Sequence, residues 1–375
     1  MKKKVIYLFT SCKNRGPTKQ TLNIIKYLDR DVYEPILVTL YKNDANDSLL
    51  SEYLQEVEQH YALDSSLKRI MLGRTQKINK IFDELEVGII HSIGLVPAHV
   101  AQKYGKCIHF TTIRNFIYDD YITKFGKLTG SLMAKMTLSI IKKSPHVYTC
   151  SESLSLLYKE RLDMELPFIR NGVDIKNFSP KNNKNNEGLK IKLGLPLDKK
   201  ILIYTGQFIA RKDQKFAIEG FLLSEASRSA CLLLLGEGVN YQQLFEKYNN
   251  HDNIIFAGNV VNVSEYLQVA DIYLSTSKSE GLPNGVLEAM ATGLPVLLSD
   301  IPQHKEIYEI NPEIGLLYEL SNQSDFSNKL DEAINSNLEA MGEESYLTVK
   351  EELNAELMSK KYQEEYQKAL LRKRD

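Results

Sequence analysis

The stretch that decides the fold of this 375-residue chain is residues 270–300, ADIYLSTSKSEGLPNGVLEAMATGLPVLLSD. A strand-length apolar run, Ile272–Ser275, leads into polar residues, a glycine turn at 281–285 and a helical pattern at 286–292 that Gly293 ends. Apolar runs and helical patterns alternate in the same way along the rest of the chain, which indicates parallel sheets covered by helices. The sequence therefore predicts an α/β protein with doubly wound, Rossmann-like domains.

The alternation occurs in two blocks, separated by a polar, Asn- and Lys-rich stretch at 179–188. We therefore expect an N-terminal domain over 1–178, a C-terminal domain over 189–351, and a helix over about 352–375 that packs back. The other predicted strands are 5–9, 35–40, 87–91, 108–113 and 147–150 in the first block and 200–205, 231–235, 254–257 and 295–299 in the second. Two such domains would place a cleft between the carboxyl ends of their sheets, where doubly wound folds bind ligands.

Composition narrows the classes of function. The formal charge of −1 argues against a nucleic-acid-binding protein. The four cysteines lack the spacing of a metal site or a disulfide framework, and no apolar run approaches the roughly 18 residues of a membrane span. We therefore expect a cytoplasmic protein that at most touches the inner face of the cell membrane. The charge is split, with 27 basic and 19 acidic residues in 1–182 against 20 and 29 in 183–375, so the two halves are expected to meet different partners.

A strand followed by a glycine turn and a helix N-terminus is typical of an anion site, because the backbone N–H groups and the positive helix end favour negative charge. Glu280 precedes this turn and Glu288 lies in the helical pattern. Carboxylates suit phosphate poorly but accept hydrogen bonds from sugar hydroxyls. The arrangement favours a sugar nucleotide as ligand.

The segment SEGLPNGVLEAMATGLPVL, which contains Glu280 and Glu288, resembles the E-x7-E signature of retaining glycosyltransferases of family 4, which have the GT-B fold of two Rossmann-like domains facing across a cleft. The resemblance implies that Glu280 contacts the transferred sugar and Glu288 the donor ribose. It also implies that the intervening loop holds the diphosphate, through Gly281, Leu282, Pro283 and Asn284. Two solvent-facing glutamates around a helix cap are the other interpretation.

A second part of the resemblance lies in residues 204–215, YTGQFIARKDQK. The family neutralises the donor diphosphate with fixed cations after a strand that ends in glycine, which implies this role for Arg211 and Lys212 beyond Gly206, with no metal ion or cofactor. A solvated surface pair is the alternative. By resemblance Gly258 lies near the nucleotide base and Gly16 near donor and acceptor, although close packing explains a lone glycine equally well.

The N-terminal half departs from the family pattern. Where family members often carry a histidine, this chain has Arg114 followed by Asn115, so the histidine role does not carry over. Arg114 is instead a candidate to bind an acceptor phosphate with two nitrogens. His91 matches another frequent family histidine and is a possible acceptor-side residue, and a structural histidine is the alternative.

Residues 124–143, KFGKLTGSLMAKMTLSIIKK, combine five lysines with Leu128, Leu132, Met136 and Ile140 at helical spacing. One interpretation is a helix that packs these four side chains into the core. The other is a basic surface that docks on anionic lipid headgroups.

The leading hypothesis is a glycosyltransferase that moves a hexosyl group from a nucleotide-diphosphate sugar, with a UDP-sugar favoured, to a hydroxyl acceptor. A lipid-linked saccharide in bacterial capsule, exopolysaccharide or cell-surface glycan synthesis fits the family's common roles. A sugar-nucleotide epimerase with a similar fold and a non-catalytic accessory subunit of a transferase complex are the alternatives.

Overall fold

The computed structural model describes residues 2–44, 47–180 and 186–372. It divides into two compact units, which we describe separately: unit 1 consists of Met1–Asn171 and Ala355–Asp375, and unit 2 of Gly172–Asn354. The chain passes from unit 1 to unit 2 after Asn171 and returns after Asn354. The unit 2 residues next to these two points are adjacent, since the Val173 N–H donates a hydrogen bond of 2.9 Å to the Leu353 carbonyl oxygen. Of the junction predicted at 179–188, residues 181–185 lie outside the described residues.

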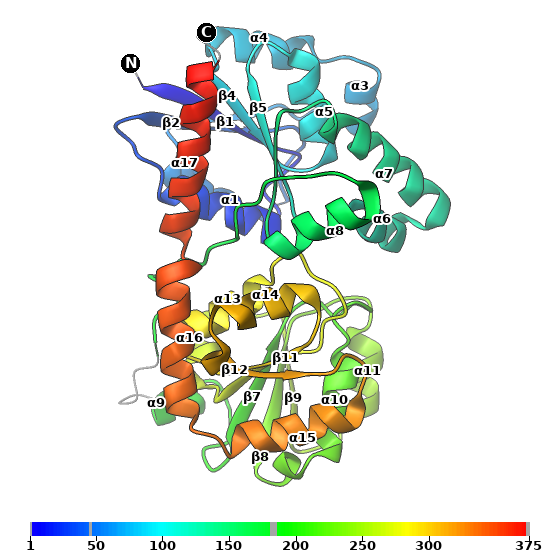
Figure 1. The fold of residues 1–375 in the computed structure, drawn as a ribbon, viewed down its shortest axis with the longest axis vertical. Helices are drawn as coiled ribbons and strands as arrows, with labels where there is room; N and C mark the ends of the chain where they lie inside the picture. The colour runs from blue at the N-terminus through cyan, green and yellow to red at the C-terminus, as the bar shows by residue number, and fades with distance from the viewer. Residues whose placement is uncertain (1, 45–46, 181–185, 373–375) are drawn as a thin grey trace. The chain divides into compact units, whose positions relative to one another are not determined.

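Unit 1 contains a six-stranded parallel sheet in the order β3-β2-β1-β4-β5-β6. Of these strands, Figure 1 labels β1, β2, β4 and β5. Its strands are β1 (Lys3–Phe9), β2 (Tyr33–Thr39), β3 (Gln59–Ala62), β4 (Ile89–Ser92), β5 (Ile108–Ile113) and β6 (His146–Thr149). Its helices are α1 (Gly16–Lys26), α2 (Leu50–Glu56), α3 (Leu67–Met71), α4 (Gln76–Glu84), α5 (Leu95–Tyr104), α6 (Ile117–Phe125), α7 (Lys127–Ile141), α8 (Glu152–Leu162) and α17 (Ala355–Arg372).

The β1 strand shows why a nearly continuous apolar sequence forms the centre of this sheet. Successive side chains of a strand point to opposite faces. Val5, Tyr7 and Phe9 accordingly belong to one buried cluster, which includes the α17 residues Met358, Tyr362 and Tyr366, whereas Ile6 and Leu8 belong to the cluster on the other face. A strand buried on both faces needs apolar residues at every position.

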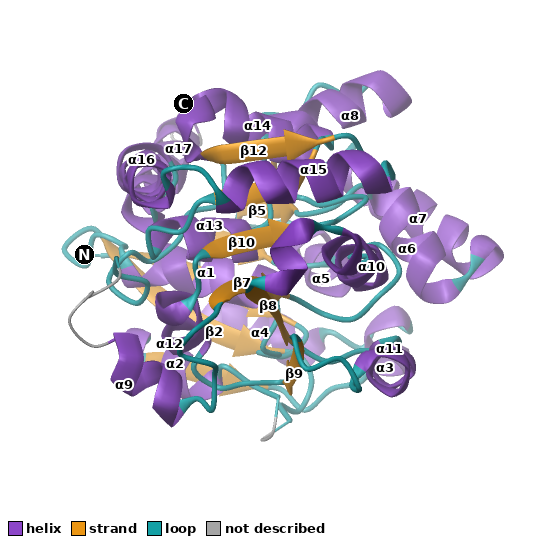
Figure 2. Cartoon of the chain, turned by 90° about the horizontal axis from the view of Figure 1, so that it is seen from below, coloured by secondary structure: helices purple, strands orange, loops and turns teal. Residues whose placement is uncertain are grey.

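Unit 2 repeats this topology with the strand order β12-β11-β10-β7-β8-β9, much of which can be followed in Figure 2. Its strands are β7 (Lys200–Thr205), β8 (Ala230–Leu235), β9 (Ile254–Gly258), β10 (Ile272–Ser275), β11 (Val296–Ser299) and β12 (Gly315–Tyr318). Its helices are α9 (Asn186–Lys192), α10 (Gln214–Leu223), α11 (Tyr241–Tyr248), α12 (Val263–Val269), α13 (Asn284–Ala291), α14 (Pro302–Ile310), α15 (Gln323–Ile334) and α16 (Leu338–Glu352), with short 3₁₀ helices η2 (Glu225–Arg228) and η3 (Pro312–Ile314).

In each unit the first strand lies beside the fourth, so that the strand order reverses between β1 and β4 and again between β7 and β10. Open α/β sheets bind ligands outside the carboxyl ends of their strands at such a reversal. The predicted α/β fold class of two doubly wound domains is confirmed, and the reversal between β7 and β10 is the first place to look for a site.

Candidate functional site

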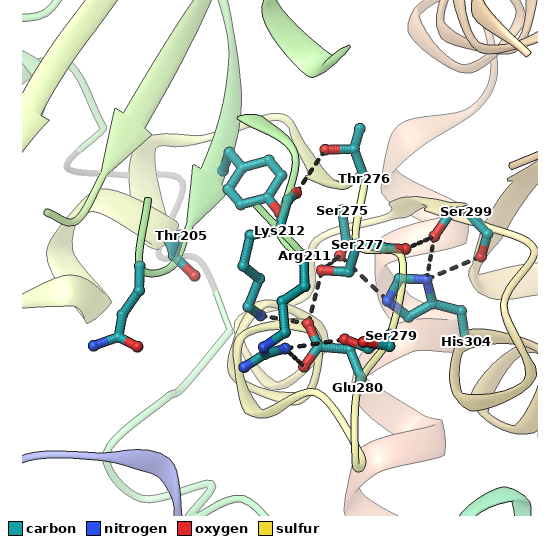
Figure 3. Close-up of polar contacts among 12 residues, drawn as sticks. Thr205, Arg211, Lys212, Ser275, Thr276, Ser277, Ser279, Glu280, Ser299 and His304 are labelled. Atoms are coloured by element: carbon teal, nitrogen blue, oxygen red, sulfur yellow. Dashed lines mark hydrogen bonds and ion pairs between the residues drawn. The ribbon is translucent and has the colours of Figure 1, made fainter. Parts of the chain in front are cut away.

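Glu280 lies at the centre of a cluster of charged and polar groups beyond the ends of β7 and β10 (Figure 3). Its Oε2 atom is 2.8 Å from Arg211 Nη1, and its Oε1 atom is 2.5 Å from Lys212 Nζ. Ser277 Oγ donates a hydrogen bond of 2.7 Å to Oε1. The Glu280 side chain is only 6% exposed, so this carboxylate is buried and paired on both oxygens. The structure thus brings together Glu280, Arg211 and Lys212, the three predicted catalytic residues.

The environment of Glu280 determines its charge. Burial alone would raise the pKa of this carboxyl group. The charges of Lys212 and Arg211, together with hydrogen bonds from Lys212 and Ser277, outweigh burial and lower the pKa of Glu280 to about 2. Glu280 is therefore ionised at neutral pH, where it accepts hydrogen bonds and has no proton to donate.

The loop that carries the two cations is held through its backbone. Tyr204 Oη donates a hydrogen bond of 2.6 Å to the Lys212 carbonyl oxygen, which also accepts one of 3.1 Å from Thr276 Oγ1. The Lys278 N–H donates a hydrogen bond of 2.7 Å to the Arg211 carbonyl oxygen. Since Tyr204 belongs to β7 and Thr276 directly follows β10, the two strands at the reversal jointly position the cation-bearing loop.

The helix α13 begins at the same edge of the sheet. Gly285, in its first turn, has no room for a side chain, because a Cβ there would lie 2.8 Å from Thr205 Oγ1 at the end of β7. Gly206 follows Thr205 directly and has a φ of +154°, which L side chains rarely adopt. These glycines let the helix start pack on the strand ends, and its positive end makes this edge of unit 2 favourable for anions.

The predicted donor-binding residues occupy different positions around this edge. Gly281, Leu282 and Pro283 are buried in the loop before α13, Asn284 is half-buried at the first position of that helix, and Glu288 is half-buried one turn further on. Gly258 ends β9 with a φ of +67°, and a Cβ there would approach Tyr241 Oη to 3.8 Å. The predicted loop and Glu288 thus lie at the start of α13, beside the central strands β7 and β10. Gly258 instead ends β9, which is an edge strand of the same sheet.

His304, which sequence reasoning missed, is also part of this region (Figure 3). It is fully buried in α14, with Nε2 3.2 Å from Ser275 Oγ and Nδ1 2.9 Å from both the hydroxyl and the carbonyl oxygen of Ser299. Burial lowers the pKa of His304 to about 4, with Lys212 acting in the same direction and Glu280 opposing it. A neutral His304 therefore ties together the ends of β10 and β11. No motif marks it, because its partners are ordinary serines.

In unit 1, Gly16 is the first residue of α1, beyond the end of β1. The preceding residue, Arg15, forms an ion pair of 2.8 Å with Asp47. Gly16 therefore lies at a helix start on the carboxyl side of β1, the strand that borders the reversal of this sheet.

His91 lies inside unit 1, on β4. Its Nδ1 atom is 2.6 Å from Tyr366 Oη, and its Nε2 atom is 3.0 Å from Thr112 Oγ1. Burial lowers the pKa of His91 to about 3, with smaller contributions from Arg114 and His109. A neutral histidine with both ring nitrogens engaged matches the structural interpretation.

Arg114 follows β5 directly. Its Nη1 atom donates a hydrogen bond to Asn171 Oδ1. Its Nε and Nη2 atoms are buried and have no hydrogen-bond partner among the described residues. Next to it, Asn115 Nδ2 donates a long hydrogen bond of 3.5 Å to Asp120 Oδ1. Arg114 therefore keeps hydrogen-bonding capacity that its own unit does not use.

In residues 2–44, 47–180 and 186–372, no group of three or more His, Cys, Asp and Glu side chains is arranged to hold a metal ion. Over the same part of the chain, no helix is both long enough and apolar enough to span a bilayer.

Comparison with known proteins connects this geometry to a family. Residues 185–348 match the family model described as "Glycosyl transferases group 1". The putative glycosyltransferase EpsD of Bacillus subtilis is 32% identical over 165 residues, which make up only 43% of each chain. An Escherichia coli UDP-Gal:alpha-D-GlcNAc-diphosphoundecaprenol alpha-1,3-galactosyltransferase is 24% identical over 304 residues, 75% of this chain and 76% of the relative. The capsular polysaccharide biosynthesis glycosyltransferase CapH of Staphylococcus aureus is 23% identical over 314 residues, 81% and 83% of the two chains.

Solved structures share the fold. Anabaena HepE in complex with UDP-glucose has a TM-score of 0.81 at 13% identity, covering 97% of this chain and 99% of that one. The sucrose-phosphate synthase of Thermosynechococcus elongatus has a TM-score of 0.79 at 18% identity, covering 98% and 100%. Identities this low establish the fold alone. The chain therefore carries a glycosyl transferases group 1 domain, has the GT-B fold, and is a glycosyltransferase.

Proposed function

We propose that this glycosyltransferase is a retaining hexosyltransferase of family 4 that uses a UDP-sugar to extend a lipid-linked saccharide during synthesis of a bacterial surface polysaccharide. The observation that carries the proposal is the cluster of Arg211, Lys212 and Glu280 beside the start of α13. Two fixed cations and a helix N-terminus suit a diphosphate, and a buried ionised carboxylate suits sugar hydroxyls.

Each donor-side residue then has a defined task. Arg211, Lys212 and the α13 N-terminus stabilise the negative charge that grows on the departing diphosphate, the role that a metal ion plays in other transferases. Glu280 accepts hydrogen bonds from the transferred sugar, and Glu288 accepts them from the ribose. Backbone close to the nucleotide is supplied by Gly206, Gly258, Gly281, Leu282, Pro283 and Asn284.

Retention of the anomeric configuration follows from attack on the same face of the sugar. A double displacement would need a carboxylate nucleophile on the far face of the sugar. Glu280 is not assigned that role, because its two oxygens are bound to Arg211, Lys212 and Ser277. In the proposed step the C1–O bond to the diphosphate breaks and the acceptor oxygen bonds to C1. The acceptor proton passes to an oxygen of the departing diphosphate. Arg211 and Lys212 keep that diphosphate in place while it takes up the proton.

The names of relatives support the choice of substrates. The E. coli galactosyltransferase is named for a UDP-Gal donor and a diphosphoundecaprenol acceptor, and CapH for capsular polysaccharide biosynthesis. HepE was solved with UDP-glucose. These substrates fit a site built around fixed cations.

We assign acceptor binding to unit 1. Arg114 has two buried nitrogens without a hydrogen-bond partner among the described residues, and a small shift of this side chain would offer them to an acceptor phosphate. Asn115 is the other acceptor-side candidate, and Gly16 at the start of α1 is proposed to lie near both the donor and the acceptor. His91 is assigned a structural role, because both of its ring nitrogens are engaged.

We also propose that the helices α6 and α7 contact the inner face of the cell membrane. The core-packed interpretation holds for Ile140, which is buried, but is wrong for Leu128 and Leu132, which are 89% and 60% exposed. Phe125 at the end of α6 is 49% exposed. The exposed Lys127 and Lys135 have no carboxylate partner in the described part of the chain. Exposed apolar side chains among unpaired lysines fit an anionic bilayer, in which the apolar groups insert and the lysines meet headgroups.

The proposal is tested by measuring transfer from a panel of UDP-, GDP- and ADP-sugars to a lipid-diphosphate-linked saccharide, followed by NMR assignment of the anomeric configuration. UDP-sugar-dependent transfer with retention is expected, and Glu280→Ala and Lys212→Ala should each abolish most of it. Full transfer by both variants would contradict the assigned mechanism. An epimer formed from the donor alone would favour the epimerase alternative, and nucleotide binding without turnover the accessory subunit.

A further inference from the structure

The two cations that the proposed function assigns to the donor diphosphate are already paired with Glu280, whose single negative charge offsets one of their two positive charges. Arg211 Nη1 and Lys212 Nζ bind separate oxygens of this carboxylate, at 2.8 Å and 2.5 Å. The exposed fraction of the Lys212 side chain is 16% and that of Glu280 is 6%, so water screens the contact only weakly. Figure 3 shows both cationic side chains pointing toward the carboxylate.

Glu280 has little freedom to move out of the way. Ser277 Oγ holds Oε1 at 2.7 Å from within the same loop, and Arg211 Nη1 also donates a hydrogen bond of 3.0 Å to the Ser279 carbonyl oxygen, next to Glu280. The pKa of Glu280, lowered to about 2 by Lys212 and Arg211 against the effect of burial, keeps it ionised. A diphosphate that enters this cluster must therefore compete with a fixed negative charge.

An intact nucleotide sugar and a free nucleoside diphosphate meet this charge differently. When the donor diphosphate binds Arg211 and Lys212, Glu280 loses these two partners. The sugar hydroxyls of the donor can then donate hydrogen bonds to Glu280 in their place. Free UDP has no sugar hydroxyls at this position, and its terminal phosphate carries additional negative charge. Leaving a buried carboxylate without partners beside an anion is costly.

Resting on the proposed function, we propose that Glu280 is a specificity-determining residue that weakens the binding of free nucleoside diphosphate relative to the nucleotide sugar. The same carboxylate that binds the donor sugar then promotes release of the spent nucleotide once that sugar has been transferred. Arg211 and Lys212 remain paired and correctly oriented in the empty enzyme, because Glu280 substitutes for the diphosphate.

The test is calorimetric titration of UDP, and of the UDP-sugar that the wild type binds best, into the full-length wild type and Glu280→Gln. Glutamine keeps the size of the side chain and removes its charge. We expect Glu280→Gln to bind UDP about tenfold more tightly than the wild type, which corresponds to the loss of one substantial charge repulsion. Its affinity for the UDP-sugar should rise much less or fall, and UDP should become a stronger inhibitor of residual transfer.

Two further variants make the result specific. Glu280→Asp keeps the charge and withdraws it by one methylene group, so its UDP affinity should lie between those of the wild type and Glu280→Gln. Glu332→Gln removes a carboxylate from an exposed pair with Lys329, 2.7 Å away on α15, and should leave UDP affinity unchanged.

The outcomes separate this inference from the proposed function. Unchanged or weaker binding of UDP by Glu280→Gln and Glu280→Asp, when the wild type binds a UDP-sugar, would overturn the inference alone. A wild type that binds neither UDP nor any nucleotide sugar would overturn the proposed function, and the inference with it.

Discussion

Tyr204 Oη donates a hydrogen bond of 2.6 Å to the carbonyl oxygen of Lys212. This bond joins the last buried residue of β7 to the loop that supplies both cations, so the strand fixes where the cations lie. Strand β7 thereby contributes to the site without presenting a charged side chain to it.

Tyr204→Phe removes this bond and leaves the Thr276 bond to the same carbonyl oxygen in place. We expect a loss of about 1 kcal/mol in the free energy of unfolding and a several-fold rise in KM for the donor sugar nucleotide, because the cation loop loosens. The control is Tyr248→Phe, which removes a hydrogen bond of 2.7 Å to Glu219 on the outside of unit 2. Equal changes in donor KM in the two variants would show that the Tyr204 bond has no special role.

Gly285→Ala tests the close contact between α13 and the strand ends. The new Cβ would clash with the Tyr273 hydroxyl and lie 2.8 Å from Thr205 Oγ1, so the helix start or these two side chains have to shift, at a cost of roughly 1–3 kcal/mol. Thermal unfolding should report the loss of stability, and calorimetry a loss of nucleotide binding. Gly188→Ala is the matched control, since a Cβ there meets nothing within 4 Å. Wild-type nucleotide affinity in Gly285→Ala would argue against α13 as part of the site.

His304 predicts a pH dependence of stability. Burial lowers the pKa of His304 from 6.5 to about 4. Between pH 6.5 and pH 4 this histidine is therefore protonated in the unfolded chain but neutral in the folded chain. Stability should therefore be lost as the pH falls from about 6.5 to about 4, by an amount on the order of 3 kcal/mol from this group. His304→Gln should remove this part of the slope in denaturant titrations at several pH values. An unaltered slope would mean that His304 is not held neutral in the folded protein.

The membrane proposal predicts that binding depends on charge and on the exposed leucines together. Lys127→Glu with Lys135→Glu should abolish cosedimentation with vesicles that contain phosphatidylglycerol, and Leu128→Ser with Leu132→Ser should weaken it. Wild-type binding should fall at high salt, because screening shortens the reach of the lysine charges. Leu223→Ser changes a leucine of unit 2 that is 70% exposed and should have no effect. Salt-insensitive binding, or equal binding to vesicles of phosphatidylcholine alone, would contradict the proposal.

The central strands could be predicted from the sequence, as could the edge strands β6 and β9, whereas the edge strands β3 and β12 could not. The predicted strands at 5–9 and 231–235 coincide closely with β1 and β8, because both are buried on their two faces and hence continuously apolar. By contrast, β3 is a short edge strand with the sequence QHYA and no fully buried position. The strand β12, GLLY, follows a 3₁₀ turn and is equally short. Neither contains an apolar run that distinguishes a strand from a loop.

A helix break also left no signal in the sequence. Residues 67–85 have continuous amphipathic spacing, yet they form two helices, α3 and α4, separated at Gly73, whose φ is +75°. Because the spacing continues across Gly73, periodicity does not reveal the break.

The sequence was sufficient to select the main charged residues of the site, but not to predict the contacts that they make with one another. Glu280, Arg211 and Lys212 could be selected because the segments that contain them, which follow predicted strands, resemble the motifs of a known family. Their mutual contacts depend on β7 and β10 being neighbours, which tertiary structure decides. His304 carried no signal, since its role depends on serines at the ends of β10 and β11. The exposure of Leu128 was likewise not predictable, because the same spacing suits a core-facing helix.

Binding of a nucleotide-diphosphate sugar by unit 2 is proposed to depend on Arg211 and Lys212. Calorimetric titration of UDP-glucose, UDP-galactose and UDP-N-acetylglucosamine into the wild type and Lys212→Ala measures this dependence. We expect saturable one-site binding of at least one of these donors by the wild type and a loss of about tenfold or more in affinity in Lys212→Ala, the expected cost of one charge-assisted contact to phosphate. Equal affinities in the two proteins would contradict the proposed dependence.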